Sequence, residues 1–266
     1  MTLRIGIAGA SGRMGQALID ATLGAADLTL TAALDVAQAS PDAIDAGARF
    51  GRHTGVCVGS DVEAAVAACD VLIDFTRPEG TLAHAAACAR HGTRLVAGTT
   101  GLDAAQKAAL AACAQRVAIV FAPNMSVGVN VLVGLVELAA ARLGPAYDIE
   151  IVEMHHKHKV DAPSGTALRL GEAAAAGAGV SLAEHAVYAR EGITGERKAG
   201  TIGFVTLRGG DVVGEHTVVF AGAGERVELT HRATSRATFA EGALRAARFV
   251  AGRAPGLYDM ADVLGI

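Results

Sequence analysis

LRIGIAGASGRMG, residues 3–15, runs from a short apolar strand into a glycine-rich turn. We predict the strand at Leu3–Ala8 and a helix after the turn. Gly9, Gly12 and Gly15 form G-x-x-G-x-x-G, a variant of the dinucleotide fingerprint, whose glycines permit a sharp turn and close approach of the backbone to a pyrophosphate. The N-terminus of the helix would offer N–H groups and the positive end of its dipole to the phosphates. The segment therefore predicts a strand–turn–helix unit that binds a dinucleotide.

A carboxylate follows the next predicted strand. Leu28–Leu34 ends at Asp35, which is placed to accept hydrogen bonds from the adenosine ribose hydroxyls of a dinucleotide. A glycine-rich turn alone is also a common βα connection, and Asp35 favours the cofactor interpretation over that one. Val36 supplies no cation for a 2′-phosphate, although Arg49 or Arg52 could reach in from a loop. We expect NADH or NADPH as cofactor, with NADH favoured.

Strands and helices alternate up to about residue 125. The first helix has Met14, Ala17, Leu18 and Ala21 on one predicted face, and further helices are expected near 79–91 and 103–115. Further strands are predicted at Val71–Phe75, Arg94–Ala97 and Val117–Phe121. Nearly continuous apolar strands alternating with helices imply a parallel sheet that is covered on both faces.

Two turns at the ends of these strands are candidates for the nicotinamide pocket. They are Gly98-Thr99-Thr100 and Ala122-Pro123-Asn124-Met125. Open α/β sheets bind ligands at the carboxyl ends of their strands, so hydroxyl and backbone groups there could line such a pocket. Simple termination of a strand stays open as the alternative for each turn.

The pattern changes after Asn124. A long apolar helix at 127–142, a strand at Asp148–Met154 and a helix near 166–176 come first. Strands predicted at Ile202–Leu207, Gly214–Phe220 and Arg226–Thr230 follow, at the spacing of antiparallel strands, and then a helix near 239–250.

We therefore predict an α/β protein of two domains. The first, over 1–126, is a Rossmann-type doubly wound parallel sheet that binds the dinucleotide, with residues 236–266 packing back on it. The second, over 127–235, is a smaller α+β domain with a mixed or antiparallel sheet, and a role in substrate binding and oligomerisation is what the family resemblance described below implies for it.

Composition excludes several classes of partner. The 266 residues are 52% hydrophobic but only 4% aromatic, and the net charge is −4, so few rings are available to stack on bases and no general attraction to polyanions exists. No run reaches the roughly 18 apolar residues of a membrane span, and no signal peptide is recognisable at the N-terminus. We expect a cytoplasmic protein with no nucleic-acid or membrane partner. The four cysteines form no C-x-x-C pair and are expected to be buried.

EMHHKHKVDAPSGTA, residues 153–167, is the most basic segment of the chain. Every residue from His155 to Lys159 can carry positive charge, and Ser164 is a candidate N-cap for the helix that follows. A basic cluster beside a helix N-terminus makes a local anion site, which suits a substrate with two carboxylates. Crowded cations favour the neutral form of each other, which brings the pKa of Lys159 and of the histidines toward values useful for acid–base catalysis.

Other interpretations of the basic segment stay open. A charge run is commonly a solvated loop. His155, His156 and His158 could bind a metal, but the neighbouring lysines oppose a cation and no cysteine is near, so we expect no metal. An RNA-binding patch is opposed by the lack of aromatic residues. The histidines that stand singly are interpreted as ordinary surface or core residues: His84, His91, His185, His216 and His231.

Taken together, these segments resemble the 4-hydroxy-tetrahydrodipicolinate reductase family, formerly called dihydrodipicolinate reductase. The resemblance runs nearly end to end, and the string H-H-x-H-K-x-D-x-P-S-G-T-A is highly specific. It rests on GASGRMG at 9–15, DFTRPEG at 74–80, AGTTG at 97–101, APNMSVGVN at 122–130, EMHHKHKVDAPSGTA at 153–167, REGITGERKAGTIGF at 190–204 and GDVVGEH at 210–216.

The resemblance implies an activity and an assembly. Such an enzyme delivers hydride from the nicotinamide to a cyclic dicarboxylate imine, with loss of the 4-hydroxyl group, to give tetrahydrodipicolinate in the diaminopimelate route to lysine. It is usually a homotetramer built through the sheets of the C-terminal domains.

The resemblance also implies roles for individual residues. His155 is similar to the acid/base histidine, Lys159 to the proton-donating lysine, and His156, Gly165 and Thr166 to the residues that hold substrate carboxylate. The dinucleotide would contact Gly9, Ala10, Ser11, Gly12, Arg13, Met14, Asp35, Gly98, Thr99, Thr100, Ala122, Pro123, Asn124 and Met125. Two positions depart from the family pattern: some members carry Arg at the position of Val36, and Phe is commoner at that of Met125.

Two competing functions remain. Another two-domain dehydrogenase, acting on an amino-acid semialdehyde, would usually use a catalytic cysteine with a histidine, and no cysteine lies in a convincing site turn. A dinucleotide-binding sensor without catalysis would need the glycine turn but not His155 and Lys159 beside an anion site.

Overall fold

The computed structural model describes residues 2–36 and 44–266, and these form two compact units. The first unit comprises Met1–Val127 and Arg236–Gly265, and the second comprises Gly128–Ser235 together with Ile266. The chain therefore leaves the first unit after residue 127 and returns to it at residue 236, close to the boundaries expected from the sequence.

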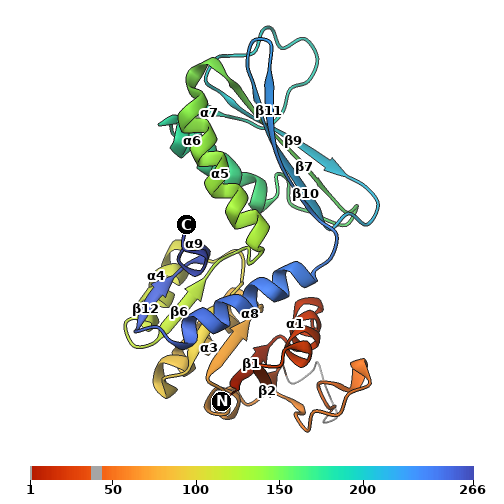
Figure 1. The fold of residues 1–266 in the computed structure, drawn as a ribbon, viewed down its shortest axis with the longest axis vertical. Coiled ribbons are helices and arrows are strands. Elements are labelled where there is room, and N and C mark those ends of the chain that lie inside the picture. Colours follow the sequence, from red (N-terminus) through yellow and green to blue (C-terminus); the bar gives the residue numbers. More distant parts are fainter. Residues whose placement is uncertain (1, 37–43) are drawn as a thin grey trace. The chain divides into compact units, whose positions relative to one another are not determined.

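The first unit is built on a parallel seven-stranded sheet in the order β12-β6-β5-β4-β1-β2-β3 (Figure 1). Strand order runs in opposite directions on the two sides of β1, which defines the doubly wound arrangement predicted from the sequence and confirms it. The strands are β1 (Leu3–Ala8), β2 (Leu28–Leu34), β3 (Val58–Gly59), β4 (Val71–Asp74), β5 (Arg94–Ala97), β6 (Ala118–Phe121) and β12 (Gly256–Tyr258).

Helices cover both faces of this sheet. Successive residues of a strand point to opposite faces, so Ile73 packs in the core with α1 and α8, and Leu72 packs in the core with α2, α3 and α4. Burial on both faces explains why the strands read as continuous apolar runs. The helices are α1 (Arg13–Gly24), the 3-10 turn η1 (Ala48–Phe50), α2 (Val62–Ala67), α3 (Pro78–His91), α4 (Ala104–Ala114), α8 (Ala237–Ala251) and α9 (Met260–Leu264).

The buried face of α1 differs from the predicted one. It is formed by Gly15, Leu18, Ile19 and Thr22. Ala17 and Ala21 are half-buried and pack against the same core as Leu18, as predicted, whereas Met14 does not belong to it. The most buried line of the helix is therefore rotated by about one residue from the predicted one. The cause lies at Gly15, where a Cβ would stand 2.0 Å from the Gly9 carbonyl oxygen, so α1 presses this edge directly against the glycine turn.

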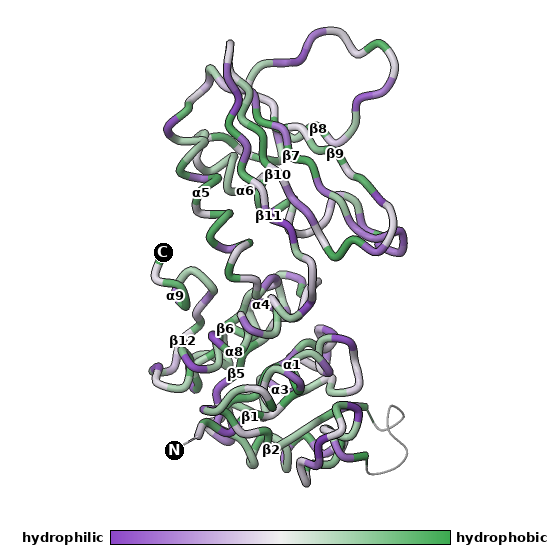
Figure 2. The backbone as a smooth tube through the Cα atoms, turned by 45° about the vertical axis from the view of Figure 1, so that its right-hand side comes forward, coloured by the Kyte–Doolittle hydropathy of each residue, from purple (hydrophilic) through white to green (hydrophobic). Residues whose placement is uncertain are grey.

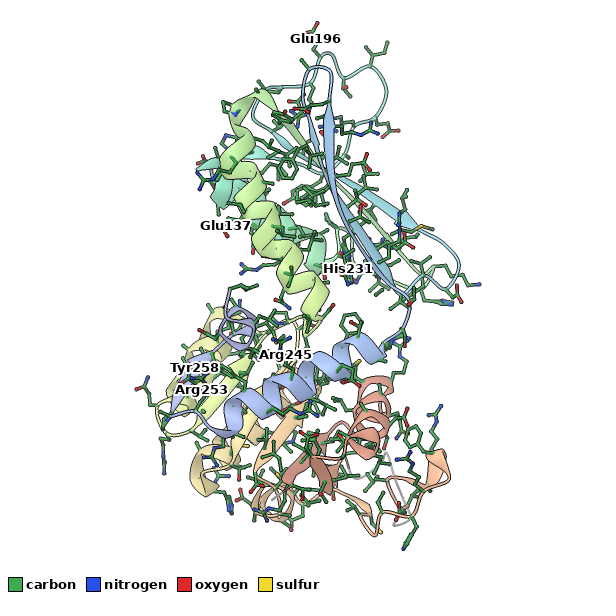
Figure 3. All side chains as sticks on the ribbon, viewed as in Figure 1. Glu137, Glu196, His231, Arg245, Arg253 and Tyr258 are labelled. Atoms are coloured by element: carbon green, nitrogen blue, oxygen red, sulfur yellow. The ribbon has the colours of Figure 1, made fainter. Side chains whose placement is uncertain are left out.

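Aromatic contacts fasten the C-terminal segment of the first unit. The rings of Phe249 on α8 and Tyr258 on β12 meet edge-on with centroids 5.6 Å apart. The Arg253 guanidinium lies 4.1 Å from the centroid of the Phe249 ring, at the end of α8 where Arg253 and Tyr258 are labelled in Figure 3. These contacts hold β12 beside β6 as the outermost strand of the sheet.

The second unit contains a mixed sheet of five strands in the order β11-β10-β7-β9-β8. β10 pairs antiparallel with β11 and β7, whereas β9 pairs parallel with β7. The expectation of three antiparallel neighbours is therefore wrong for β9, because the chain crosses over through a helix before returning beside β7. The elements are α5 (Val127–Leu143), η2 (Gly144–Ala146), β7 (Asp148–His155), α6 (Gly165–Ala178), α7 (Leu182–His185), β8 (Ala186–Val187), β9 (Ile202–Arg208), β10 (Gly214–Ala221) and β11 (Arg226–Ala233).

One face of this sheet carries the core of the second unit. Burial alternates along β7, with Ile149, Ile151, Glu153 and His155 on the buried side. The two isoleucines pack with α5 and α6, and Glu153 and His155 continue the same face beyond the apolar core. The strand period of two thus places an acid and a histidine side by side below the surface.

Helix α5 is apolar along most of its length (Figure 2). Over Val127–Ala146 it is the one helix, among the residues that the structure describes, that is long and apolar enough to cross a membrane by length and composition. Leu132 and Val136 pack into the core of the second unit, and Leu135 and Leu138 are exposed. A single helix of this kind is weak evidence for a membrane span.

Candidate functional site

The predicted cofactor turns meet at one edge of the first sheet. β1, β4, β5 and β6 are parallel neighbours, so the turns that follow them share the carboxyl edge of the sheet. Gly9–Met14 follows β1, Gly98–Thr100 follows β5, and Ala122–Met125 follows β6. The crevice where strand order reverses, between β1 and β4, is where open α/β sheets bind dinucleotides.

The glycine turn presents backbone to this edge. Gly12 is the N-cap of α1 and has no side chain with which to cap it, and the first turn of α1 contains no acidic residue. An uncapped helix start of this kind suits a phosphate group. Because a Cβ on Gly15 would overlap the Gly9 carbonyl, only glycine allows the turn to fold so tightly. This cradle fits the pyrophosphate of a dinucleotide.

Asp35 closes the glycine turn from the end of β2. Its Oδ2 accepts a hydrogen bond from the Ser11 backbone N–H at 2.7 Å, and its Oδ1 accepts one from the Val36 N–H at 2.8 Å. Arg52 donates to the Leu23 carbonyl at 2.5 Å, at the C-terminal end of α1. Arg52 is therefore engaged away from the acidic residue that would hold the ribose.

A buried acid–histidine pair lies under the same edge and was missed in the sequence. Asp74, the last residue of β4, is fully buried and bonds His84 Nδ1 at 2.7 Å. Its other oxygen accepts from the backbone N–H and the hydroxyl of Thr76, both at 2.7 Å. His84, interpreted as an ordinary residue, is thus the partner of a buried carboxylate. An aspartate that ends the apolar run Val71–Asp74 was the available signal.

The remaining predicted cofactor residues differ in accessibility. The Thr99 side chain is buried and its hydroxyl lies 2.6 Å from that of Thr81 on α3, while Thr100 is exposed. Met125 is fully buried in the core beside α8, whereas Pro123 is exposed. In this conformation Thr100 and Pro123 therefore offer surface at the edge, whereas Thr99 and Met125 lie below it.

The second unit brings the basic segment together with the start of α6. The Ser164 side chain accepts from the Ala167 N–H at 3.1 Å, which confirms Ser164 as the N-cap. Gly165 and Thr166 form the first turn of the helix beyond it. Lys159 Nζ lies 2.9 Å from a carboxylate oxygen of Asp161 in the preceding loop.

Backbone hydrogen bonds fix the start of that loop. The His156 N–H donates to the Val212 carbonyl at 2.8 Å, and the Lys157 N–H donates to the Gly210 carbonyl at 3.3 Å. These bonds join the loop to the turn between β9 and β10. The basic segment is therefore partly anchored, in contrast to the freely solvated loop that was an alternative interpretation.

His155 has two close partners inside the unit. Its Nδ1 lies 2.6 Å from Glu153 Oε2, and its ring meets that of His216 edge-on with centroids 5.1 Å apart. Burial lowers the pKa of His155 below its ordinary value, and the bond to Glu153 opposes this change. The lowering predicted from crowded cations is found here with burial as its main cause.

His216 belongs to the same cluster, although its sequence context was interpreted as that of an ordinary surface or core residue. It is buried on β10, and its Nε2 lies 3.0 Å from the Ser164 hydroxyl. Burial lowers the pKa of His216 to about 3, so the ring is neutral near pH 7. His231, on the neighbouring strand β11 (Figure 3), has a pKa lowered by burial as well.

The cysteines were expected to be buried, and no metal site was expected. Cys69 and Cys88 are buried as expected, but the expectation is wrong for Cys57, which is exposed, and Cys113 is half-buried. Burial raises the pKa of Cys69 to about 12, which makes it a poor nucleophile. Within residues 2–36 and 44–266, no group of three or more His, Cys, Asp or Glu side chains is arranged to hold a metal ion.

The first unit has a parallel doubly wound sheet with a glycine turn, and the second is an α+β unit with a buried histidine beside a helix N-terminus. Together these features define a two-domain dinucleotide-dependent oxidoreductase. Family models described as dihydrodipicolinate reductase, N-terminus and C-terminus, match residues 3–125 and 128–264. The chain belongs to the dihydrodipicolinate reductase family, now called 4-hydroxy-tetrahydrodipicolinate reductase, whose members act in lysine and diaminopimelate biosynthesis.

Individual relatives agree with this assignment. A protein of Thiobacillus denitrificans named 4-hydroxy-tetrahydrodipicolinate reductase is 59% identical over 266 residues and covers 100% of both chains. One of Herminiimonas arsenicoxydans with the same name is 56% identical, over 99% of this chain and 98% of its own. The family resemblance read from the motifs is confirmed.

Solved structures show the same architecture. A dipicolinate-bound dihydrodipicolinate reductase from Paenisporosarcina sp. TG-14 is 27% identical, with a TM-score of 0.78 over 98% of this chain and 99% of that one. An amine dehydrogenase from Mycobacterium smegmatis, 14% identical, shares the fold with a TM-score of 0.62 over 98% of this chain and 96% of its own.

Proposed function

We propose that this chain reduces 4-hydroxy-tetrahydrodipicolinate to tetrahydrodipicolinate with NADH or NADPH, releasing water. The observation that carries the proposal is the cluster of the second unit, in which His155, held by Glu153, lies with Lys159 around the N-terminus of α6. A positive loop beside a helix start suits a ligand with two carboxylates. The solved relative bound to dipicolinate, a cyclic dicarboxylate, supports the same class of substrate.

The roles of the residues follow from their chemistry. In the first unit Gly9–Met14 and Asp35 would hold the dinucleotide, which supplies a hydride when bound. In the second, His156, Gly165 and Thr166 would hold substrate carboxylate. Reduction consumes one hydride and one proton as the 4-hydroxyl leaves as water, so a proton donor is required. Lys159 would donate that proton, with His155 as the acid/base partner.

The cofactor preference we propose is for NADH. Asp35 places a negative charge where a 2′-phosphate would lie, and Val36 next to it offers no cation. Arg52 is engaged at the end of α1, which leaves Asp35 without a basic partner from that residue. An aspartate in this position favours two free ribose hydroxyls over a phosphate.

We also propose that the protein is a homotetramer assembled through the second unit. The outer face of its sheet, opposite α5 and α6, carries Val152 and Met154 on β7 beside Val205 and Leu207 on β9. Both β9 side chains are exposed, at 41% and 45%. Apolar neighbours on an uncovered sheet face are typical of a protein interface. We propose a cytoplasmic location for the protein as well.

The test is oxidation of NADH that depends on the condensation product of aspartate semialdehyde and pyruvate. His155→Ala and Lys159→Ala should each lower kcat by about 10²–10⁴-fold, the usual contribution of acid–base catalysis. Binding of NADH, followed by fluorescence, should be unchanged in both variants because neither residue lies in the first unit. Equal turnover in the three proteins would remove these residues from the mechanism. Binding of NADH without turnover in the wild type would favour a sensor.

A further inference from the structure

A single carboxylate, Glu153 on β7, lies at the centre of the second unit's cluster and is 1% exposed. Each of its oxygens accepts more than one hydrogen bond. Oε2 accepts from His155 Nδ1 at 2.6 Å and from Arg208 Nη1 at 2.8 Å. Oε1 accepts from Arg208 Nη2 at 2.9 Å, from the Ser164 N–H at 3.0 Å and from the Thr206 hydroxyl at 3.3 Å. The carboxylate is thus saturated with donors although it is removed from water.

The partners of Glu153 and Arg208 are the functional parts of the site. Glu153 bonds the acid/base candidate His155 and the N-cap of α6. Arg208 Nη2 also donates to the Asp161 backbone carbonyl at 2.6 Å, and the Asp161 side chain pairs with Lys159. The Glu153–Arg208 ion pair therefore contacts His155, the N-terminus of α6 and the loop that carries Lys159.

The bond to Glu153 decides which ring nitrogen of His155 is available. A carboxylate that already accepts four other donors is ionised, so Nδ1 carries the hydrogen and Nε2 carries the lone pair. Gly214 on β10 flanks Nε2, and a Cβ there would stand 3.0 Å from it. Any side chain at this position would therefore crowd Nε2, and glycine avoids that contact.

We propose that the Glu153–Arg208 pair is the positioning device of this active site: it fixes His155 in the Nδ1–H tautomer and holds the α6 N-terminus and the Lys159 loop in register with it. Neither residue is assigned a contact with substrate. This inference rests on the proposed function for the role of His155, and extends it to two residues of strands β7 and β9.

Arg208 explains how a buried acid can orient a histidine without keeping it charged. Burial opposes ionisation of Glu153, but the hydrogen bonds from Arg208, His155 and Ser164 outweigh it and lower the pKa of Glu153 to about 2. The guanidinium fork matches the carboxylate and neutralises it. Burial keeps the pKa of His155 below its ordinary value, against the opposing effect of Glu153.

Other titratable groups near His155 lie in the Lys159 loop, on β9 and on β10. Lys159 and Arg208 lower the pKa of His155, from the loop and from β9. On β10, His216 is buried and neutral, and on β7 Glu153 raises the pKa of His155 through its hydrogen bond and its charge. Removing the Glu153 charge should therefore move the His155 pKa further down.

The test is Glu153→Gln, which keeps the shape of the side chain and removes its charge. Imidazole ¹⁵N signals of the intact protein without ligands should show His155 protonated at Nδ1 in the wild type, and mixed or protonated at Nε2 in the variant. The inflection of kcat against pH that belongs to His155 should move to lower pH. We expect kcat to fall about 10–100-fold, as when a residue that orients a histidine is lost, with the KM for NADH unchanged.

Glu63→Gln is the matched control. Glu63, half-exposed on α2 of the first unit, also accepts from one arginine and one histidine, Arg90 and His91, the latter at 2.6 Å. This substitution should alter the imidazole signals of His91 and leave those of His155, kcat and its pH profile unchanged.

Two outcomes would overturn the proposal. One is an unchanged His155 tautomer and pH inflection in Glu153→Gln, even if activity falls, because a purely structural role predicts that result. The other is the same pair of unchanged readouts in Arg208→Lys, which keeps the charge but loses the two-pronged contact, and which replaces the first variant if Glu153→Gln does not fold. Failure of the proposed reaction is distinguishable, because the ¹⁵N signals are read without turnover.

Discussion

The Asp35 carboxylate joins the end of β2 to the glycine turn through the Ser11 N–H. We predict that Asp35→Ala raises the KM for NADH about tenfold, since loss of a charged hydrogen bond to a ribose hydroxyl costs about 1.5 kcal/mol. The KM for NADPH should change less, because the repulsion of its phosphate is removed at the same time. Steady-state kinetics with both cofactors measure the two effects.

A matched change tests whether charge alone matters at this position. Asp20→Ala removes an exposed acid from α1 of the same unit and should leave both KM values as they are. A wild type that prefers NADPH strongly would contradict the assignment of Asp35 as a selector of NADH.

Single residues were predictable where their partners are close in sequence. Ser164, Lys159 and His155 were proposed together because one segment contains them with the helix start, and the N-cap role of Ser164 is confirmed. Arg208 and His216 were not, because they reach Glu153 and Ser164 across 55 and 52 positions of the chain. A hydrogen bond between distant strands leaves no pattern in one sequence, whereas a capping residue does.

At the scale of elements, the N-cap residue of α6 has two roles, because it caps the helix and also contacts a buried histidine. Ser164→Ala removes the cap of the Ala167 N–H and the partner of His216 Nε2. We predict a loss of about 2–3 kcal/mol in the free energy of unfolding, from about 1 for the cap and about 1–2 for a buried polar atom without a partner. Urea denaturation measures it.

Ser181→Ala supplies the comparison for that change. Ser181 occupies the N-cap position of α7 but makes no capping hydrogen bond with its side chain. Its removal should alter the free energy of unfolding by less than about 0.5 kcal/mol. Equal losses in the two variants would show that the buried contacts of Ser164 add nothing.

Long elements were predictable from periodicity, and short ones were not. β1 and β2 were placed to the residue because apolar runs bounded by turn residues are unambiguous. β3, with two residues, and β12, with three, carry too few side chains to form a pattern. The parallel pairing of β9 with β7 depends on which strands become neighbours in space, which strand spacing along the chain does not report.

At the scale of the whole molecule, the outer face of the second sheet is the interface that we propose for assembly. We predict that Val205→Lys converts the proposed tetramer into smaller species, because burying an unpaired ammonium group in an apolar interface is costly. Sedimentation velocity of the purified protein measures the change. Val131→Lys on α5 is the control, since the two valines are 41% and 39% exposed. A wild-type mass for Val205→Lys, or a monomeric wild type, would contradict the proposed interface.

The division into units was indicated by the change of pattern after residue 124, where regular alternation gives way to a long apolar helix and, from residue 202, to strands separated by turns. What the sequence supported less directly is the return of the chain, since a single helical pattern near residues 239–250 carried that expectation. The buried face of this helix consists mostly of alanine, which is a weak hydrophobic signal in a sequence. The structure shows that Ala240, Ala243 and Leu244 are buried in the core of the first unit.

The return of the chain has a consequence for biosynthesis. α8 fills one layer of the first unit, and β12 completes its sheet, yet both are translated after the whole second unit. While the ribosome is still adding residues 128–235, the newly made β1–β6 region exposes the apolar layer that α8 will cover. The first unit cannot complete its core and its sheet until residues 237–264 have been made. Nascent chains paused before residue 237 should therefore be the form that chaperones recognise.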